Sequence, residues 1–151
     1  MALVGNMIAE AFAGNPSIIN YDMFVAVFSM LSLLYLIPVA IKDSFAMHPL
    51  IPLILDVLNT LFFLCGGIAM AAILRVHSCG SRGYLRSNSI TNGSRNMGKR
   101  CHEGQATTAF LWFAFAAYLA SAVISGLGSR NSGTTLRSGG IRRGGPSMSQ
   151  V

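Results

Sequence analysis

The stretch LIPLILDVLNTLFFLCGGIAMAAIL, residues 50–74, decides the fold of this chain. Its only charged residue is Asp56, and it is long enough to cross the hydrocarbon core of a bilayer, which takes about 20 residues. Two similar runs, at about 23–41 and 106–127, contain no charged residue. Buried helices of soluble proteins seldom stay free of charge over such a length. The three runs therefore predict an all-α membrane protein with three spans.

The overall composition agrees with a chain that is solvated by lipid. Hydrophobic residues make up 52% of the 151 residues and charged residues only 11%, against about 25% in soluble domains. The formal net charge is +6, which in a soluble protein would suggest a nucleic-acid partner. Here the basic residues lie between and after the apolar runs, so we expect them to meet lipid headgroups, with no nucleic-acid partner.

Polar segments divide the chain. Residues 1–14 are apolar but too short to span, and Asn15-Pro16 then predicts a turn. Residues 42–49 connect the first two spans, which we expect to be antiparallel neighbours. Residues 75–105 are predicted to form a surface loop without a core of its own. Residues 129–151 are rich in Gly, Ser and Arg and are predicted to be a disordered tail.

The second span carries a polar face. Asp56, Asn59 and Thr60 have the spacing i, i+3, i+4 and therefore share one side of the helix. An acid within hydrocarbon costs several kcal/mol and is a candidate for proton, ion or headgroup contact. The simpler interpretation is that Asp56 pairs between helices and that Asn59 and Thr60 form interhelical hydrogen bonds. We prefer this interpretation because a transporter usually needs more than one acid within the membrane, and the three predicted spans contain no acid besides Asp56.

The loop at 75–105 contains two signals of sidedness. Cys79 and Cys101 flank it near the span ends and could form a disulfide, which persists only on the oxidising side of the membrane. Asn92-Gly93-Ser94 is an N-glycosylation sequon. Together they predict an extracellular loop and a cytosolic tail. The basic residues do not determine the orientation, because the loop and the segments on the other side of the membrane carry nearly equal numbers of them. The alternative is a cytosolic loop with two free cysteines.

No arrangement of residues points to catalysis. His48, His77 and His102 are scattered, and no metal-binding or nucleophile motif is present, so we expect no enzyme activity, metal or cofactor. The tail has four arginines that could bind anionic lipids of the cytoplasmic leaflet. They are Arg130, Arg137, Arg142 and Arg143.

Several stretches resemble a known family. They are the polar segment Leu55 to Thr60, Val76-His77-Ser78-Cys79, the run Ser87 to Ser94, Cys101, Gln105-Ala106 before an aromatic span, and the final Ser149-Gln150-Val151. Over about residues 21–151 the chain resembles the fungal non-classical export protein 2 family, whose members have a MARVEL domain. The resemblance implies a four-helix membrane bundle with cytosolic termini and an external, cysteine-bearing loop.

The family pattern has four spans and this chain supplies three. We therefore expect residues 1–20 to be the remnant of a first transmembrane helix plus a turn, and residues 21–128 to form the MARVEL-like domain. The resemblance also implies a plasma-membrane protein that organises the furrow-like microdomains called eisosomes. It further implies roles in sphingolipid-responsive signalling and in non-classical protein export.

Two functions follow as hypotheses. The first is an organising protein whose partners are the bilayer, including sphingolipids and anionic lipids, other microdomain proteins and further copies of itself. The second is a small transporter or channel subunit in which Asp56 handles the ion. A membrane-bound enzyme comes last, because the sequence lacks paired acids or a nucleophile near the membrane surface.

Overall fold

The computed structural model describes residues 1–12, 14–41, 50–75 and 77–138, with side chains described as far as Gly128. Five helices lie within these ranges: α1 (Ala2–Ala9), α2 (Ser17–Ile41), α3 (Leu50–Leu74), α4 (Arg82–Ser87) and α5 (Met97–Ser138). The same ranges contain no strand, only one isolated antiparallel bridge between Ala11 and Ser94. The expected connection at 42–49 lies outside the described residues.

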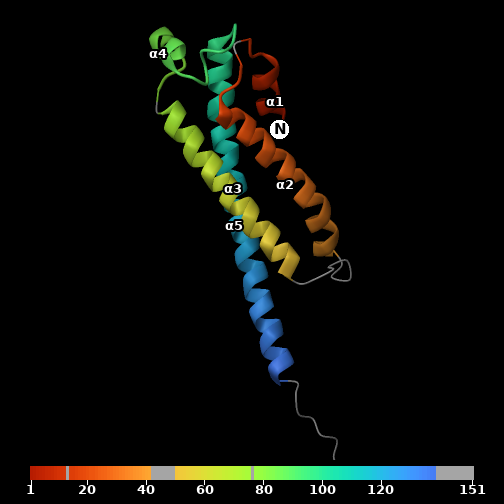
Figure 1. Ribbon diagram of the computed structural model, residues 1–151. Helices are drawn as coiled ribbons and strands as arrows, with labels where there is room; N and C mark the ends of the chain where they lie inside the picture. Colours follow the sequence, from red (N-terminus) through yellow and green to blue (C-terminus); the bar gives the residue numbers. More distant parts are fainter. Residues whose placement is uncertain (13, 42–49, 76, 139–151) are drawn as a thin grey trace, which may run out of the picture.

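The long helices α2, α3 and α5 form an elongated bundle (Figure 1). α3 packs along α5 in the largest interface, and α2 packs against α3. α1, α4, the start of α5 and the end of α3 gather at one end of the bundle (Figure 1). The described part of α5 runs from that end to the other, which gives the molecule a loop end and a tail end.

The all-α membrane class is confirmed. α2, α3 and the part of α5 from Met97 to Gly128 are long and apolar enough to cross a membrane. Their outer faces expose large apolar side chains, such as Leu34, Phe113 and Ile124, each more than two-thirds exposed. Such surfaces are compatible with hydrocarbon as the surrounding solvent.

Two helices extend beyond the apolar runs. α2 begins at Ser17 and not near residue 23, and α5 begins at Met97 and not near residue 106. The helix also continues to Ser138, ten residues into the segment 129–151 that was predicted to be disordered. Hydropathy marks where a helix is apolar, whereas the backbone keeps its helical hydrogen bonds beyond that point.

The prediction that the loop lacks a core of its own is wrong. Cys79, Leu85 and Cys101 are buried together, with Tyr84 and Met97 packed against them. α4 supplies Leu85, and the Tyr84 hydroxyl donates a hydrogen bond to the carbonyl oxygen of Leu74 at the end of α3. Burial raises the pKa of the Tyr84 hydroxyl above its ordinary value, so this donor stays protonated to a higher pH than a free tyrosine. The loop is therefore attached to the end of the bundle.

Candidate functional site

The polar face of α3 turns into the bundle. Asp56 is 2% exposed, Asn59 is fully buried and Thr60 is also buried. Thr60 Oγ1 donates to the carbonyl oxygen of Asp56 at 2.7 Å, and Asn59 Nδ2 donates to that of Leu55 at 2.9 Å. Two of the three polar groups thus bond within α3 itself, where serine, threonine and asparagine commonly bond to the preceding turn.

Asp56 makes the interhelical contact of this face. Ser121 Oγ on α5 donates to Asp56 Oδ2 at 2.6 Å, while Oδ1 has no hydrogen-bond partner among the described residues. A hydroxyl donated to a carboxylate is a charge-assisted hydrogen bond and is stronger than a neutral one. The Asp56–Ser121 hydrogen bond therefore joins α3 to α5 in the interior of the bundle.

A second buried acid, Asp22, corrects the expectation that the spans contain only Asp56. Asp22 lies on α2 because this helix begins at Ser17, and its side chain is 1% exposed. Neither carboxylate oxygen has a hydrogen-bond partner in the described structure. The carboxylate fits beside Gly66 of α3, where an added Cβ would lie 2.8 Å from Asp22 Oδ1.

Hydroxyl groups lie between the helices as well. Ser29 Oγ on α2 and the Tyr118 hydroxyl on α5 form a hydrogen bond of 2.8 Å. The ring of Tyr118 stacks on Phe63 of α3, with 5.5 Å between ring centroids. Asp22 and Ser29 are two turns apart on one face of α2, so both point toward the other helices. Polar groups from all three long helices thus share the interior.

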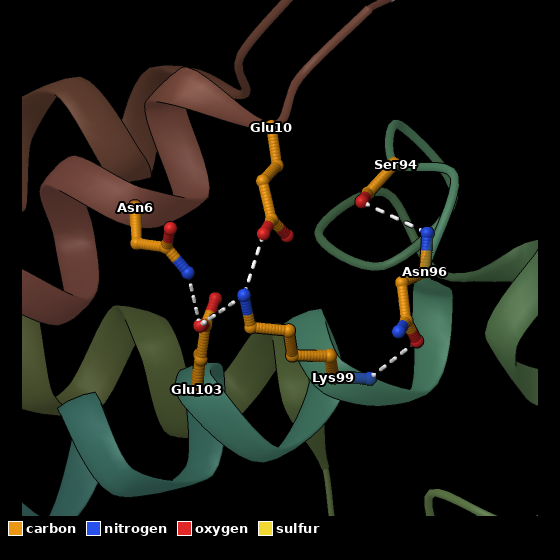
Figure 2. Close-up of polar contacts among 6 residues, drawn as sticks. All are labelled: Asn6, Glu10, Ser94, Asn96, Lys99 and Glu103. Carbon is orange, nitrogen blue, oxygen red and sulfur yellow. Dashed lines mark hydrogen bonds and ion pairs between the residues drawn. The ribbon is translucent and has the colours of Figure 1, made fainter.

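At the loop end, polar side chains fasten the N-terminal segment to α5. Figure 2 shows Lys99 Nζ bonded to Glu10 Oε1 at 2.5 Å and placed 3.7 Å from Glu103 Oε1. Asn6 Nδ2 donates to the same Glu103 oxygen (Figure 2). Nearby, the buried Arg100 donates from Nη2 to Asn15 Oδ1 at 3.0 Å. These contacts bind α1 and the following turn to the start of α5.

The structure places the two loop cysteines in a disulfide. Cys79 and Cys101 are bonded, with 5.8 Å between their Cα atoms. Asn92 of the sequon is exposed, and its Nδ2 donates to the carbonyl oxygen of Arg86 at 3.2 Å. His77 stacks on Tyr84, and within the described ranges no group of three His, Cys, Asp or Glu residues could hold a metal ion.

The structure does not describe the side chains of the four tail arginines. Arg142 and Arg143 lie outside the described residues, and the side chains of Arg130 and Arg137 are likewise not described. Sequence reasoning also missed Asp22, Ser29 and Tyr118 as interior polar residues, and it did not foresee Ser121 as the donor to Asp56. The spacing of Asp22 and Ser29 was the available signal, because residues seven apart lie on the same face of a helix, two turns from each other.

The fold and the polar interior define a multi-span α-helical membrane protein. The sequence profile of MARVEL, the membrane-associating domain, matches residues 1–124, which include α1. The chain belongs to the non-classical export protein 2 family, as the resemblance in its sequence indicated.

Three curated relatives illustrate the similarity. Non-classical export protein 2 homolog 1 of Saccharomyces cerevisiae is 33% identical over 91% of this chain and 81% of its own length. Non-classical export protein 102 of Candida albicans is 35% identical over 100% of this chain and 88% of its own. The Schizosaccharomyces pombe homolog of non-classical export protein 2 is 32% identical over 76% of this chain.

The length of the match differs between relatives. The chain spans 61% of the S. pombe protein and 62% of non-classical export protein 2 of S. cerevisiae. No solved structure shows significant similarity to the chain.

Proposed function

We propose that this protein organises membrane microdomains of the eisosome type in the plasma membrane and is not an enzyme. The observation that carries the proposal is the match of a membrane-associating domain to residues 1–124 of a bundle that buries its polar groups. Proteins that bear the name non-classical export protein are its relatives, which supports a role in the export of proteins without signal peptides.

The outer surface supports a role in lateral association. Large apolar side chains are exposed along all three long helices, including Leu34 on α2, Ile68 on α3 and Phe113 on α5. Within a bilayer such faces contact lipid tails or other membrane helices. We propose as partners sphingolipids, other microdomain proteins and further copies of this chain. Anionic lipids are the proposed partners of the tail arginines.

We also propose an orientation, with residues 75–105 outside the cell and the C-terminus in the cytosol. The disulfide between Cys79 and Cys101 supports it, because disulfides persist on the oxidising side of a membrane. The exposed Asn92 supports it as well, since glycosylation acceptors lie on that side.

Fluorescence imaging tests the organising role. The protein carrying a C-terminal fluorescent tag should collect in stable patches at the plasma membrane of a fungal cell. Co-fractionation with plasma-membrane markers provides the control for correct delivery. A uniform distribution of correctly delivered protein would contradict the proposal.

A second candidate function, an ion-handling subunit, is favoured by one observation. Asp22 joins Asp56 as a buried acid between the long helices, where the sequence had indicated Asp56 alone. Proton and ion pathways in membranes use such acids. Asp56→Asn should then abolish proton or cation flux in reconstituted vesicles while the protein stays folded. Equal flux in the variant and the parent would exclude this function.

A further inference from the structure

The buried acid between α3 and α5 has no cationic side chain to balance it within the spans. Asp56 is 2% exposed; its Oδ2 accepts a hydrogen bond from Ser121, and its Oδ1 has no partner among the described residues. Neither α2 nor α3 nor residues 106–128 of α5 contain a lysine, arginine or histidine. A buried carboxylate is normally paired with a cationic group or a metal ion, because removing its charge from water is costly.

A second unpaired acceptor lies at the same level of α3. Asn59 is fully buried, and its Oδ1 has no hydrogen-bond partner in the described structure. Its Nδ2 donates to the carbonyl oxygen of Leu55 at 2.9 Å, so the amide leans back against the turn that contains Asp56. Residues three apart on one face of a helix have Cβ atoms about 5–6 Å from each other. The unpaired oxygens of Asp56 and Asn59 therefore belong to one small part of the interface.

α5 closes the other side of this position. Asp56 bonds to Ser121, and Phe63 stacks on Tyr118 with 5.5 Å between ring centroids. Asn59 lies between Asp56 and Phe63 along α3, so it faces the turn of α5 that runs from Tyr118 to Ser121. The Ser121 hydroxyl donates to Asp56 and keeps lone pairs for another contact. Side-chain oxygens of Asp56, Asn59 and Ser121 thus gather between the two helices.

We propose that Asp56, Asn59 and Ser121 bind one alkali-metal cation. The carboxylate supplies the balancing charge, and the amide and hydroxyl oxygens are neutral ligands of the kind that hard cations take. One positive charge neutralises Asp56, whereas a divalent ion would leave an excess charge in the interior of the bundle. The described ranges contain no group of three His, Cys, Asp or Glu residues that would suit a transition metal.

The site lies within reach of the water at the tail end of the bundle. Asp56 is the seventh residue of α3, so it lies about 9 Å along the helix from Leu50 at 1.5 Å per residue. The assignment deepens the ion-handling candidate and rests on the same acid, since it names the class of ion that Asp56 holds. Binding is measured apart from flux, so that the two can fail separately.

Thermal unfolding of the full protein in detergent tests the site with the ions themselves. Chlorides of sodium, potassium and N-methyl-D-glucamine are compared at equal ionic strength and constant pH. The unfolding midpoint should rise with sodium or potassium and saturate with concentration, because a ligand that binds only the folded state stabilises it. The bulky organic cation should give no such rise. The alkali cation with the lower half-saturating concentration is the preferred ligand.

Two variants and a matched control locate the ion. Asp56→Asn should abolish the rise that depends on the alkali cation. Asn59→Leu, which keeps the charge of the site, should raise the half-saturating concentration at least about tenfold. Ser29→Ala removes a different interhelical hydrogen bond and should lower the midpoint in every salt while the rise persists. A single symmetric peak in size-exclusion chromatography reports folding. If Asp56→Asn misfolds, Asn59→Leu decides.

Three results would overturn the proposal. The first is the same midpoint for the parent in alkali and N-methyl-D-glucamine chlorides. The second is an Asp56→Asn variant that folds and keeps the rise. The third is a midpoint that responds to pH and not to the alkali cation, which would assign the neutralisation of Asp56 to a proton alone. A saturable rise without flux in reconstituted vesicles would exclude the ion-handling function and support the binding site.

Discussion

At the scale of single residues, Gly66 determines how closely α3 can approach Asp22. Its neighbour Gly67 faces the ring of Trp112, where an added Cβ would lie at 3.4 Å, an ordinary contact. At Gly66 the same addition would lie 2.8 Å from Asp22 Oδ1. The two adjacent glycines therefore allow a matched comparison. An added methyl group is too close to its neighbour at Gly66, whereas there is room for it at Gly67.

Gly66→Ala should lower the stability of the bundle by about 1–3 kcal/mol, because the methyl group displaces the Asp22 carboxylate in a packed interior. Gly67→Ala should change it by less. Thermal unfolding of both variants in the same detergent measures the difference. Equal midpoints for the two variants would show that α3 does not approach Asp22 as described.

Ser121→Ala should destabilise the protein by about 1–3 kcal/mol, because it leaves the buried Asp56 carboxylate without the donor at 2.6 Å. Asp56→Asn combined with Ser121→Ala forms a double-mutant cycle that isolates the pair. We expect the serine substitution to cost less in the Asp56→Asn variant than in the parent. Additive effects in this cycle would mean that the two side chains do not interact.

The α3 polar face was predictable at this scale, whereas its partners were not. The spacing of Asp56, Asn59 and Thr60 placed them together, since helical periodicity acts along one segment. The pairing of Asp56 with Ser121 depends on how α3 packs against α5, which no local pattern contains. Asp22 was missed because hydropathy placed the first span at 23–41, one residue after this acid, although α2 begins at Ser17.

At the scale of elements, polar contacts outside the apolar run accompany the early start of α5. α5 begins at Met97, ahead of the expected residue 106, and its first turns carry Lys99, Arg100 and Glu103. Lys99 and Glu103 meet partners from the N-terminal segment (Figure 2). Arg100 donates to Asn15 of the following turn. A hydropathy window detects the uncharged part of a helix and therefore cannot locate such a beginning.

The disulfide is the principal covalent restraint on these elements, because it joins the loop to the start of α5. Replacing both Cys79 and Cys101 by Ser should cost about 3 kcal/mol, the loop-closure entropy for a sequence separation of 22. Cys65→Ser, which removes an exposed free cysteine on α3, is the matched control and should leave the unfolding midpoint unchanged. Midpoints in detergent that agree among the parent and both variants would contradict a structural role for the bond.

At the scale of the whole molecule, three spanning helices separate two ends. α1 and α4 lie at the loop end, and α5 continues to the other (Figure 1). The Cys79–Cys101 disulfide also belongs to the loop end, because Cys101 is in the second turn of α5. The number and class of the spans were predictable because hydrocarbon imposes a long uncharged run on each of them. The small core beneath the loop was not, since its residues are few and scattered in the sequence.

Accessibility of cysteines from the two sides tests the membrane-spanning bundle most directly. In a Cys65→Ser background the Cys79–Cys101 disulfide leaves no free cysteine, so single cysteine reporters are introduced and intact fungal spheroplasts are treated with a membrane-impermeant maleimide. A reporter at the exposed loop position, Asn92→Cys, should be labelled without permeabilisation, and a Ser147→Cys reporter in the tail only after it. Labelling of loop and tail from the same side would contradict a chain that crosses the bilayer three times.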